Sequence, residues 1–224
     1  MIGSVRVVGT GRAGSAIVGR LRERRIPVTA GREPLADADL VLLAVPDGAI
    51  AGLAAQVPIG PWIAHVSGAT SISALAPHER RFSVHPLQTL SLQRGPEQLD
   101  GAWAAITFET DAARAAAEWL AGTLGLRAFP LADADKPLYH AGAAIASNFL
   151  VTLYRVAARL LEESNAPPDA LVPLMQRTIE NGFVLTGPIA RGDWTTVEAH
   201  LRALEERAPD LVPVYRALAE ATRP

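Results

Sequence analysis

The sequence predicts an α/β protein in which an N-terminal Rossmann-type, mostly parallel sheet is followed by an all-helical C-terminal domain. Three observations favour this fold. Short apolar runs alternate with helix-like segments over the first ~130 residues, which is typical of an open α/β sheet. A glycine-rich turn joins the first apolar run to the first helical segment. After Pro130 the apolar spacing is helical, and no strand is expected there.

Each expected strand is a short apolar run bounded by turn residues. Val5–Val8 and Leu40–Val45 are apolar on both faces, as a parallel strand covered by helices on both sides requires. The other expected strands are Ile26–Ala30, Trp62–Val66, Phe82–Val84 and Ala104–Phe108. Apolar residues at helical spacing predict the intervening helices Ala13–Arg24, Gly48–Gln56, Ser71–Leu75 and Asp111–Leu124.

The second half of the chain is expected to consist of helices. One long helix, or two abutting ones, should cover Ala132–Glu163. The later helices are expected at Pro167–Leu185, Trp194–Arg207 and Pro209–Ala221. The pattern therefore predicts a dinucleotide-binding domain at residues 1–130 and a helical domain at residues 131–224, and the family resemblance described below implies that the second domain binds substrate and dimerises.

Composition excludes several classes of function. The chain has 224 residues, 49% of them apolar, which indicates a folded globular protein. Its formal charge of -2 and the lack of a basic block argue against nucleic-acid or anionic-membrane partners. Without cysteine there are no disulfides, thiolate metal sites or thiol nucleophiles, and no metal site is predicted. No signal-peptide pattern is present, and no apolar run approaches the ~18 residues of a membrane span. A cytoplasmic protein is expected.

The segment GTGRAG has the spacing of a dinucleotide-binding turn. Gly9 would permit the tight turn, Gly11 would let the backbone approach a pyrophosphate, and Gly14 would let helix and strand pack closely. The helix N-terminus then offers N–H groups to the phosphates. A glycine turn that only packs is the alternative. The residues expected to bind the cofactor here are Gly9, Thr10, Gly11, Arg12, Ala13 and Gly14.

The end of the second strand should select between NADP(H) and NAD(H). Arg32 follows Gly14 by roughly the 20 residues at which such turns place the ribose-reading residue, and an arginine there accommodates a 2′-phosphate. The sequence therefore favours NADP(H). Glu33 supports the alternative, because a carboxylate at this point would hold two ribose hydroxyls. A solvated Arg–Glu loop without a ligand is the third interpretation.

Three more loops are expected at the same edge of the sheet. Val45 and Pro46 end the third strand and should lie beside the dinucleotide. Ser67 offers a hydroxyl to the cofactor or the substrate. His85 and Gln88 offer donors to a substrate carboxylate or carbonyl. His85 could equally be a structural residue of its loop.

The helix KPLYHAGAAIASNFL carries three candidate catalytic residues at helical spacing: Lys136, His140 and Asn148. Residues four apart on a helix lie on the same side. If that side faces the substrate, His140 could donate the proton that a reduced carbonyl needs, since imidazole titrates near neutrality. Lys136 could donate the proton itself or make His140 a stronger donor, and Asn148 could orient the carbonyl. The alternative is a solvated lysine beside a half-buried packing histidine.

Several motifs together resemble a known family, the short Rossmann-like oxidoreductases whose helical C-terminal half is a domain of unknown function. The resemblance extends over nearly the whole chain. The motifs that carry it are the glycine turn, VSGA at 66–69, HPLQ at 85–88, the helix at 136–150, TGPIARGD at 186–193 and TVEAHL at 196–201. It implies relatives among ketopantoate reductase, pyrroline-5-carboxylate reductase and the 6-phosphogluconate dehydrogenase-like enzymes. It also implies that Thr186 contacts the substrate and that the chain dimerises through its helical domain.

Ketopantoate reductase carries a catalytic lysine and later asparagines on the corresponding helix. Aligning Asn148-Phe149-Leu150 with the last asparagine segment puts His140 at the lysine position. Lys136 then lies one turn earlier, and Ala144 occupies the place of the middle asparagine. The expected function is NADP(H)-dependent reduction of a small 2-keto acid of the ketopantoate type between the two domains. Imine reduction of the pyrroline-5-carboxylate type and a non-catalytic NADP(H)-binding sensor or partner protein are the alternatives.

Overall fold

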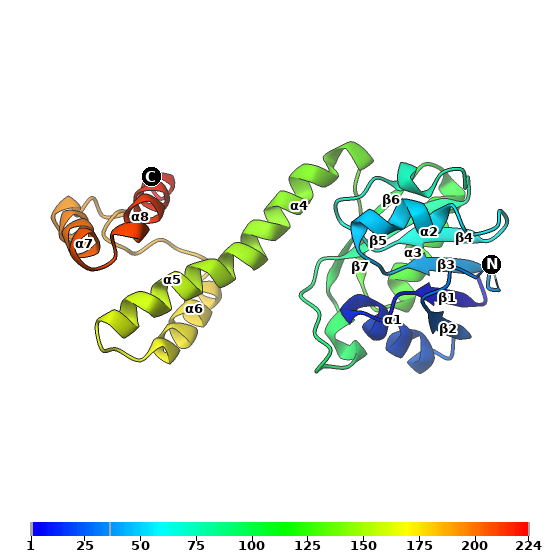
Figure 1. Ribbon diagram of the computed structural model, residues 1–224, viewed down its shortest axis with the longest axis horizontal. Helices are drawn as coiled ribbons and strands as arrows, with labels where there is room; N and C mark the ends of the chain where they lie inside the picture. Colours follow the sequence, from blue (N-terminus) through cyan, green and yellow to red (C-terminus); the bar gives the residue numbers. More distant parts are fainter. Residues whose placement is uncertain (1, 36, 224) are drawn as a thin grey trace. The chain divides into compact units, whose positions relative to one another are not determined.

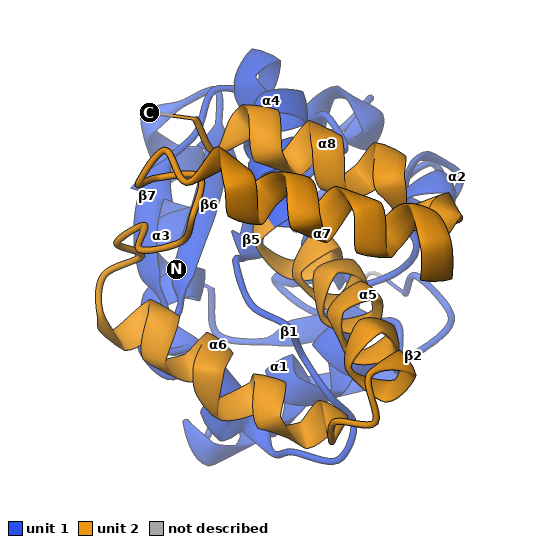
Figure 2. Ribbon diagram, turned by 90° about the vertical axis from the view of Figure 1, so that its left-hand side faces the viewer, with its two compact units in different colours: residues 1–145 blue, residues 146–224 orange. Residues whose placement is uncertain are grey.

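The computed structural model describes residues 2–35 and 37–223 of the chain. They form two compact units, residues 1–145 and residues 146–224 (Figure 2). The domain boundary expected at residues 130 and 131 coincides with the end of the last strand, whereas the division by compactness falls after Ile145. Residues 131–145 therefore fold with the sheet, and the placement of the functional boundary stays a prediction.

A seven-stranded sheet forms the centre of the first unit (Figure 1), and it confirms the expected fold class. The strand order is β2-β1-β3-β4-β5-β6-β7. The pair β5–β6 is antiparallel, and the other pairs of neighbouring strands are parallel. The strands are β1 Val5–Val8, β2 Val28–Gly31, β3 Leu40–Leu43, β4 Trp62–His65, β5 Arg81–Pro86, β6 Trp103–Phe108 and β7 Arg127–Pro130.

Strand β7 is the one strand that the sequence pattern missed. It pairs in parallel with β6 at the edge of the sheet, and both Arg127 and Ala128 are exposed. An edge strand covered on one side has no continuous apolar run, and Pro130 is tolerated because only one side of the strand is paired. Its signal was therefore too weak to separate it from a loop.

Three helices of the first unit pack on the two faces of the sheet: α1 Arg12–Glu23, α2 Ile50–Ala54 and α3 Asp111–Thr123. A fourth helix, α4 Lys136–Ala144, follows β7. Four short 3-10 turns join them: η1 Asp47–Ala49, η2 Ile72–Leu75, η3 Pro96–Leu99 and η4 Asp133–Asp135. Alternate residues of β3 face opposite layers, so Leu40 and Leu42 pack with α1 and α3 while Val41 and Leu43 pack with α2. This double burial explains why β3 is apolar throughout.

The second unit is helical, as expected. Its helices are α5 Leu150–Glu163, α6 Leu171–Glu180, α7 Trp194–Arg207 and α8 Val212–Ala221, with 3-10 turns η6 Pro168–Ala170 and η7 Pro209–Leu211. A π-helical turn, Ile145–Phe149, precedes α5, so the chain is helical from Asp133 to Glu163 as predicted. The expected helix Pro167–Leu185 is too long, because Gly182 adopts a positive φ of 70° soon after α6 and ends it.

The segment Asp133–Glu163 corrects one expectation. By length and composition it could cross a membrane, since its best 18-residue window has a mean hydropathy of 1.3. The expectation that no stretch of the chain reaches this level is therefore wrong. The segment is amphipathic and not apolar all round: α5 carries Arg155, Arg159 and Glu162, and the Arg159 guanidinium bonds Asp210 at 2.6 and 3.0 Å. A membrane span is apolar on all sides, whereas this pattern is typical of a helix with one packed face.

A buried lysine fixes where α4 begins. The Lys136 side chain is only 2% exposed, and its ammonium donates to the Thr70 carbonyl at 2.6 Å and to the Ser83 hydroxyl at 3.1 Å. Its third partner is the Asp133 carboxylate at 3.1 Å. Three donors meet three acceptors, which is the condition for keeping an ammonium away from water. Lys136 thus joins α4 to β5 and to the loop that follows β4.

Asp133 holds the other half of this junction. Its carboxylate accepts from the Ile72 N–H at 3.1 Å and from the Ser71 hydroxyl. Burial acts to raise the pKa of Asp133, but the Ser71 and Ile72 hydrogen bonds and the Lys136 ammonium outweigh it, so this pKa lies below its usual value. Burial lowers the pKa of Lys136, and the Asp133 carboxylate opposes that effect. The Asp133 carboxylate thus ties the turn before α4 to η2.

Replacing Lys136 by methionine should destabilise the first unit. The Asp133 carboxylate would lose its counter-ion in a partly buried place, which we expect to cost about 3 kcal/mol of unfolding free energy. Urea unfolding followed by tryptophan fluorescence measures this, since Trp62, Trp103 and Trp119 report on the first unit. The double variant Lys136→Met/Asp133→Asn should recover part of the loss. A single variant as stable as the wild type would contradict the role of Lys136 as an anchor.

Candidate functional site

The candidate site lies in the first unit, at the carboxyl ends of its parallel strands. β1, β3, β4 and β5 run in the same direction, so the loops that follow them meet at one edge of the sheet. From β1 the chain passes to β2 on one side and then returns to β3 on the other. Such a reversal leaves a crevice between the two loops, and it is where ligands bind in open α/β sheets.

In the glycine turn after β1, an added side chain would clash at Gly9 and at Gly14 but not at Gly11. A Cβ on Gly9, whose φ is 113°, would lie 2.2 Å from the Ala44 carbonyl oxygen. A Cβ on Gly14 would lie 2.1 Å from the Gly9 carbonyl oxygen. On Gly11 it would meet nothing within 4 Å. Close packing alone therefore explains why glycine is needed at Gly9 and Gly14. At Gly11 the backbone faces open space at the N-terminus of α1. This arrangement fits a pyrophosphate.

The other expected cofactor residues surround this turn. Thr10 and Arg12 are exposed, and the Thr10 carbonyl accepts the Ser15 hydroxyl at 3.1 Å. Ala13 lies in the first turn of α1. Val45, which with Pro46 follows β3, has a methyl group 3.2 Å from the point where a Gly9 Cβ would lie. The loops after β1 and β3 are thus in contact, as a crevice between them requires.

Arg32 stands exposed at the end of β2. No hydrogen bond or ion pair joins its side chain to another described residue. The backbone beside it is held by the buried Arg6, which donates to the Glu33 carbonyl at 3.1 and 3.3 Å. Gly31 makes room for this guanidinium, since a Cβ there would lie 2.7 Å from an Arg6 nitrogen. Arg32 is therefore a free cation on a fixed loop, and its contact with a 2′-phosphate stays a prediction.

The loop after β4 is closed by Ser67. Its hydroxyl donates to the Thr70 hydroxyl at 3.0 Å and accepts the N–H groups of Ala69 and Thr70 at 3.2 and 2.9 Å. Its own N–H donates to the His65 Nδ1 at 3.2 Å. The Ser67 hydroxyl is thus occupied in holding the loop, and its predicted ligand contact would have to compete with these bonds. The same loop supplies the Thr70 carbonyl to Lys136.

His85, near the end of β5, is enclosed by two elements. The Gly68 backbone lies against its ring, since a Cβ there would be 2.7–2.9 Å from three ring atoms. On α4 the Tyr139 hydroxyl lies 2.7 Å from the His85 Nδ1. The His140 ring is 6.3 Å away, centroid to centroid. The structure therefore brings His85, Tyr139 and His140 together beside the loop of Ser67.

Burial and the neighbouring charges keep the His85 imidazole neutral. Burial lowers the pKa of His85 to about 4, and the positive charges of His140 and Lys136 add to this effect against the opposing charge of Asp47. Burial raises the pKa of Tyr139 to about 12. At neutral pH the pair is a neutral imidazole bonded to a protonated phenol. Burial, assisted by the Lys136 charge, likewise lowers the pKa of His65 to about 4.

His140, the third member of this cluster, is exposed on α4. The other predicted substrate residues lie outside the cluster. Gln88 is exposed, and its amide donates to the Gln98 carbonyl at 3.3 Å. Asn148 lies in the π-helical turn and Thr186 in an exposed loop, both in the second unit. The π-helical turn interrupts the four-residue spacing that linked Asn148 to His140. The roles of all four stay predictions.

Tyr139 is the site residue that the sequence reasoning missed. It lies three positions after Lys136, on the same side of α4, so helical spacing alone could have included it. Attention to residues that titrate near neutrality or carry an amide left the phenol out. Its importance follows from its bond to His85, which comes from a strand 54 residues earlier in the chain.

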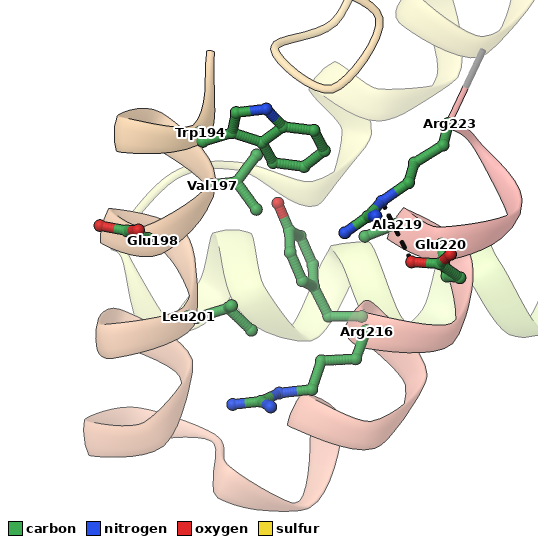
Figure 3. A pocket seen from close by; sticks show the side chains of 9 residues that line it. Trp194, Val197, Glu198, Leu201, Arg216, Ala219, Glu220 and Arg223 are labelled. Carbon is green, nitrogen blue, oxygen red and sulfur yellow. Dashed lines mark ion pairs between the residues drawn. The ribbon is translucent and has the colours of Figure 1, made fainter. Parts of the chain in front are cut away.

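The second unit contains a separate hollow of about 450 Å³ between α7 and α8 (Figure 3). Trp194 and Arg223 line its rim, with the guanidinium 4.9 Å from the indole centroid. Arg223 also pairs with Glu220 at 3.0 Å. The charges at this rim are thus already paired locally, and no strand edge or glycine turn contributes to it. The chemistry of the candidate site is not repeated here.

Two family profiles match the chain, and the second begins at residue 102, ahead of both the expected boundary and the division by compactness. The profile of a Rossmann-like domain matches residues 4–89, and that of a domain of unknown function, DUF2520, matches residues 102–222. No curated protein matches. Among solved structures, a Bacteroides fragilis protein assigned as an NADP oxidoreductase is 21% identical with a TM-score of 0.79, over 98% of this chain and 97% of that one.

Two further solved structures share the fold. A Thermotoga maritima protein is 24% identical with a TM-score of 0.70, over 97% of this chain and 98% of that one. The reductive aminase of Aspergillus terreus, solved with NADPH and ethyl levulinate, is 17% identical with a TM-score of 0.67, over 99% and 93% of the two chains. At these identities the likeness establishes the fold alone. The DUF2520 match covers more than half of the sequence, so the chain belongs to the DUF2520 family, and the Rossmann-like match precedes that range.

Proposed function

We propose that the protein is an NADP(H)-dependent oxidoreductase. The observation that carries this proposal is the glycine turn, in which Gly11 alone is bare toward open space at a helix N-terminus beside the strand-order reversal. The descriptions of two structural neighbours, an NADP oxidoreductase and an NADPH-bound aminase, support it. A cluster of proton-bearing side chains at the same sheet edge adds a reason to expect turnover and not only binding.

The substrate that fits best is a small 2-keto acid of the ketopantoate type. A bound NADPH would supply hydride to its carbonyl carbon. The chain must then orient the carboxylate and carbonyl and provide one proton. We assign orientation to His85, Gln88 and Ser67. An imine of the pyrroline-5-carboxylate type is the second candidate, favoured by the likeness to a reductive aminase.

We propose that the proton comes from the start of α4. His140 is its exposed member and connects the cluster with water. Lys136 is a positioning residue, because all three of its donors are engaged and only 2% of the side chain is exposed. Its charge acts on the neighbouring imidazoles, helping to keep His85 and His65 neutral. A sensor protein that only binds NADP(H) would need none of these groups.

Substitutions in the glycine turn should separate cofactor binding from folding. Gly11→Ala adds a methyl group where a pyrophosphate would approach, so we expect NADPH affinity to fall at least tenfold with unfolding free energy nearly unchanged. Gly14→Ala is the matched control, since its Cβ would meet the Gly9 carbonyl and should destabilise the fold. NADPH titration by calorimetry and urea unfolding measure the two effects.

An activity assay with the same variant tests turnover. Wild-type protein should oxidise NADPH, followed by its absorbance, with ketopantoate or with pyrroline-5-carboxylate as the acceptor. Gly11→Ala should lose this activity while it remains folded. NADPH binding with no turnover on either acceptor would favour the sensor, and unimpaired binding by Gly11→Ala would contradict the assignment of the turn.

Arg32 should determine the preference for NADPH over NADH. Arg32→Ala removes a charge-assisted contact with the 2′-phosphate, so NADPH affinity should fall by roughly 1.5–3 kcal/mol while NADH affinity stays nearly constant. Arg22→Ala, which removes an exposed arginine from the last turn of α1, is the matched control for net charge. Equal losses for both cofactors would show that Arg32 does not read the phosphate.

We also propose that the apolar surface of the second unit is covered by a second copy of the chain. No residue of α5 is buried, and thirteen large apolar side chains of the described residues 146–224 are exposed. At several tens of Å² to about 100 Å² each, they expose on the order of 1,000 Å², above the ~800 Å² per partner of a standard interface. The charged side of α5 argues for a protein partner over a membrane.

A charge on this surface should weaken the dimer. Leu174, on α6, is 62% exposed, and Leu174→Glu should raise the dimer Kd at least tenfold by burying a carboxylate. Ile59→Glu is the control, since Ile59 is 70% exposed but lies in the first unit. Light scattering should give twice the 23.7 kDa chain mass for wild type and the control. A monomeric wild type, or one that binds neutral lipid vesicles, would contradict the proposal.

A further inference from the structure

The His85–Tyr139 contact has a consequence for proton transfer. The two side chains share one hydrogen bond of 2.7 Å, and their rings meet edge to face at 87°. A neutral imidazole carries one N–H and a phenol one O–H, so the shared bond uses one proton and leaves the other free. One member of the pair therefore presents an unshared proton to its surroundings.

The packing around the pair selects which member that is. The Gly68 backbone lies against the Cε1, Nδ1 and Nε2 edge of the imidazole, close enough that a Cβ would be 2.7–2.9 Å from each atom. Tyr139 lies on α4, is half-buried and has its ring edge-on against Phe129. The Gly68 backbone thus restricts the imidazole on one side, and we take the phenol as the member that presents its proton to a ligand.

We infer that Tyr139 hands the proton to the substrate, with His85 as its positioning partner and His140 as the solvent-side end of the path. This inference rests on the proposed oxidoreductase function. Tyr139 would then be a catalytic residue that neither the motif spacing nor the family resemblance identifies.

The step balances as follows. The carbonyl carbon gains a hydride with its two electrons, and the C–O π pair moves onto oxygen. That oxygen takes the proton of the Tyr139 hydroxyl. The resulting phenolate takes the proton of the His85 Nδ1, and the Nε2 regains one from water on the side of His140. The net uptake is one hydride from a reduced nicotinamide cofactor and one proton from solvent.

The charges that face the pair favour this direction. His140 and Lys136 are the positive groups near His85, and Asp47 is the negative one. Together with burial, these charges keep the His85 imidazole neutral. Its N–H can therefore donate a hydrogen bond to the Tyr139 phenolate as that phenolate forms. A phenol whose pKa is raised to about 12 stays protonated at every pH below that value. Proton supply should consequently be constant across neutral pH, whereas supply by a free histidine would fall above its ordinary pKa of ~6.5.

Tyr139→Phe is the decisive variant. We expect it to lower the single-turnover rate of NADPH oxidation by about 10²–10⁴-fold and to leave the Kd of NADPH within twofold of wild type. Tyr215→Phe is the matched control, because the Tyr215 hydroxyl also lies 2.8 Å from a histidine Nδ1, that of His200, but in the second unit. His140→Gln should cost less than Tyr139→Phe. The wild-type rate should be flat between about pH 6 and 9.

Nitrogen NMR of the protein without substrate supplies a readout independent of activity. His85 should be neutral at pH 7, and its Nδ1 signal should shift in Tyr139→Phe and stay in place in Tyr215→Phe. An unchanged Nδ1 signal would overturn the inference, as would a wild-type rate that falls with a midpoint near pH 6.5. So would an active wild type matched by Tyr139→Phe, with the proposed function left intact. A wild type that binds NADPH but reduces neither acceptor would overturn both.

Discussion

The Lys136 ammonium is the contact on which the geometry of the candidate site depends. Helix α4 follows β7, and Leu138 in its first turn is 80% exposed, so it does not bind the helix to the sheet. Thr70 and Ser83 belong to the loop after β4 and to β5, and Asp133 precedes the helix, so one cation joins three segments. Tyr139 and His140 follow within the next turn. Their positions beside His85 are set by where the lysine is held.

This arrangement gives the lysine a different role from the one its sequence position implies. A catalytic lysine must have an N–H donor free to contact the substrate. All three donors of Lys136 are engaged by other described residues. Its charge nevertheless reaches the site, because in a poorly solvated cluster it disfavours the protonation of His65 and His85. A positioning residue can thus set the protonation states of its neighbours while it makes no contact with a ligand.

Much of the fold could be predicted from the sequence because its signals are local. β3 is apolar on both faces, the glycine turn has fixed spacing, and α7 shows helical periodicity over its full length; each depends on residues within one element. The site was harder. The burial of Lys136 depends on Thr70 and Ser83, which lie 66 and 53 residues away in the sequence. The edge strand β7 likewise owes its conformation to its pairing with β6, which a local pattern does not contain.

The chain contains two tyrosine–histidine pairs of nearly the same geometry, and the difference between them shows what makes a site. The Tyr215 hydroxyl lies 2.8 Å from the His200 Nδ1, with an angle of 89° between the ring planes. The Tyr139 hydroxyl lies 2.7 Å from the His85 Nδ1, with an angle of 87° between the ring planes. His200 is exposed on a helix, so water can satisfy it. His85 lies at the end of a parallel strand, under a glycine and between charged neighbours. Under the proposed function, the same hydrogen bond has a chemical use only at the sheet edge, where a cofactor would bind.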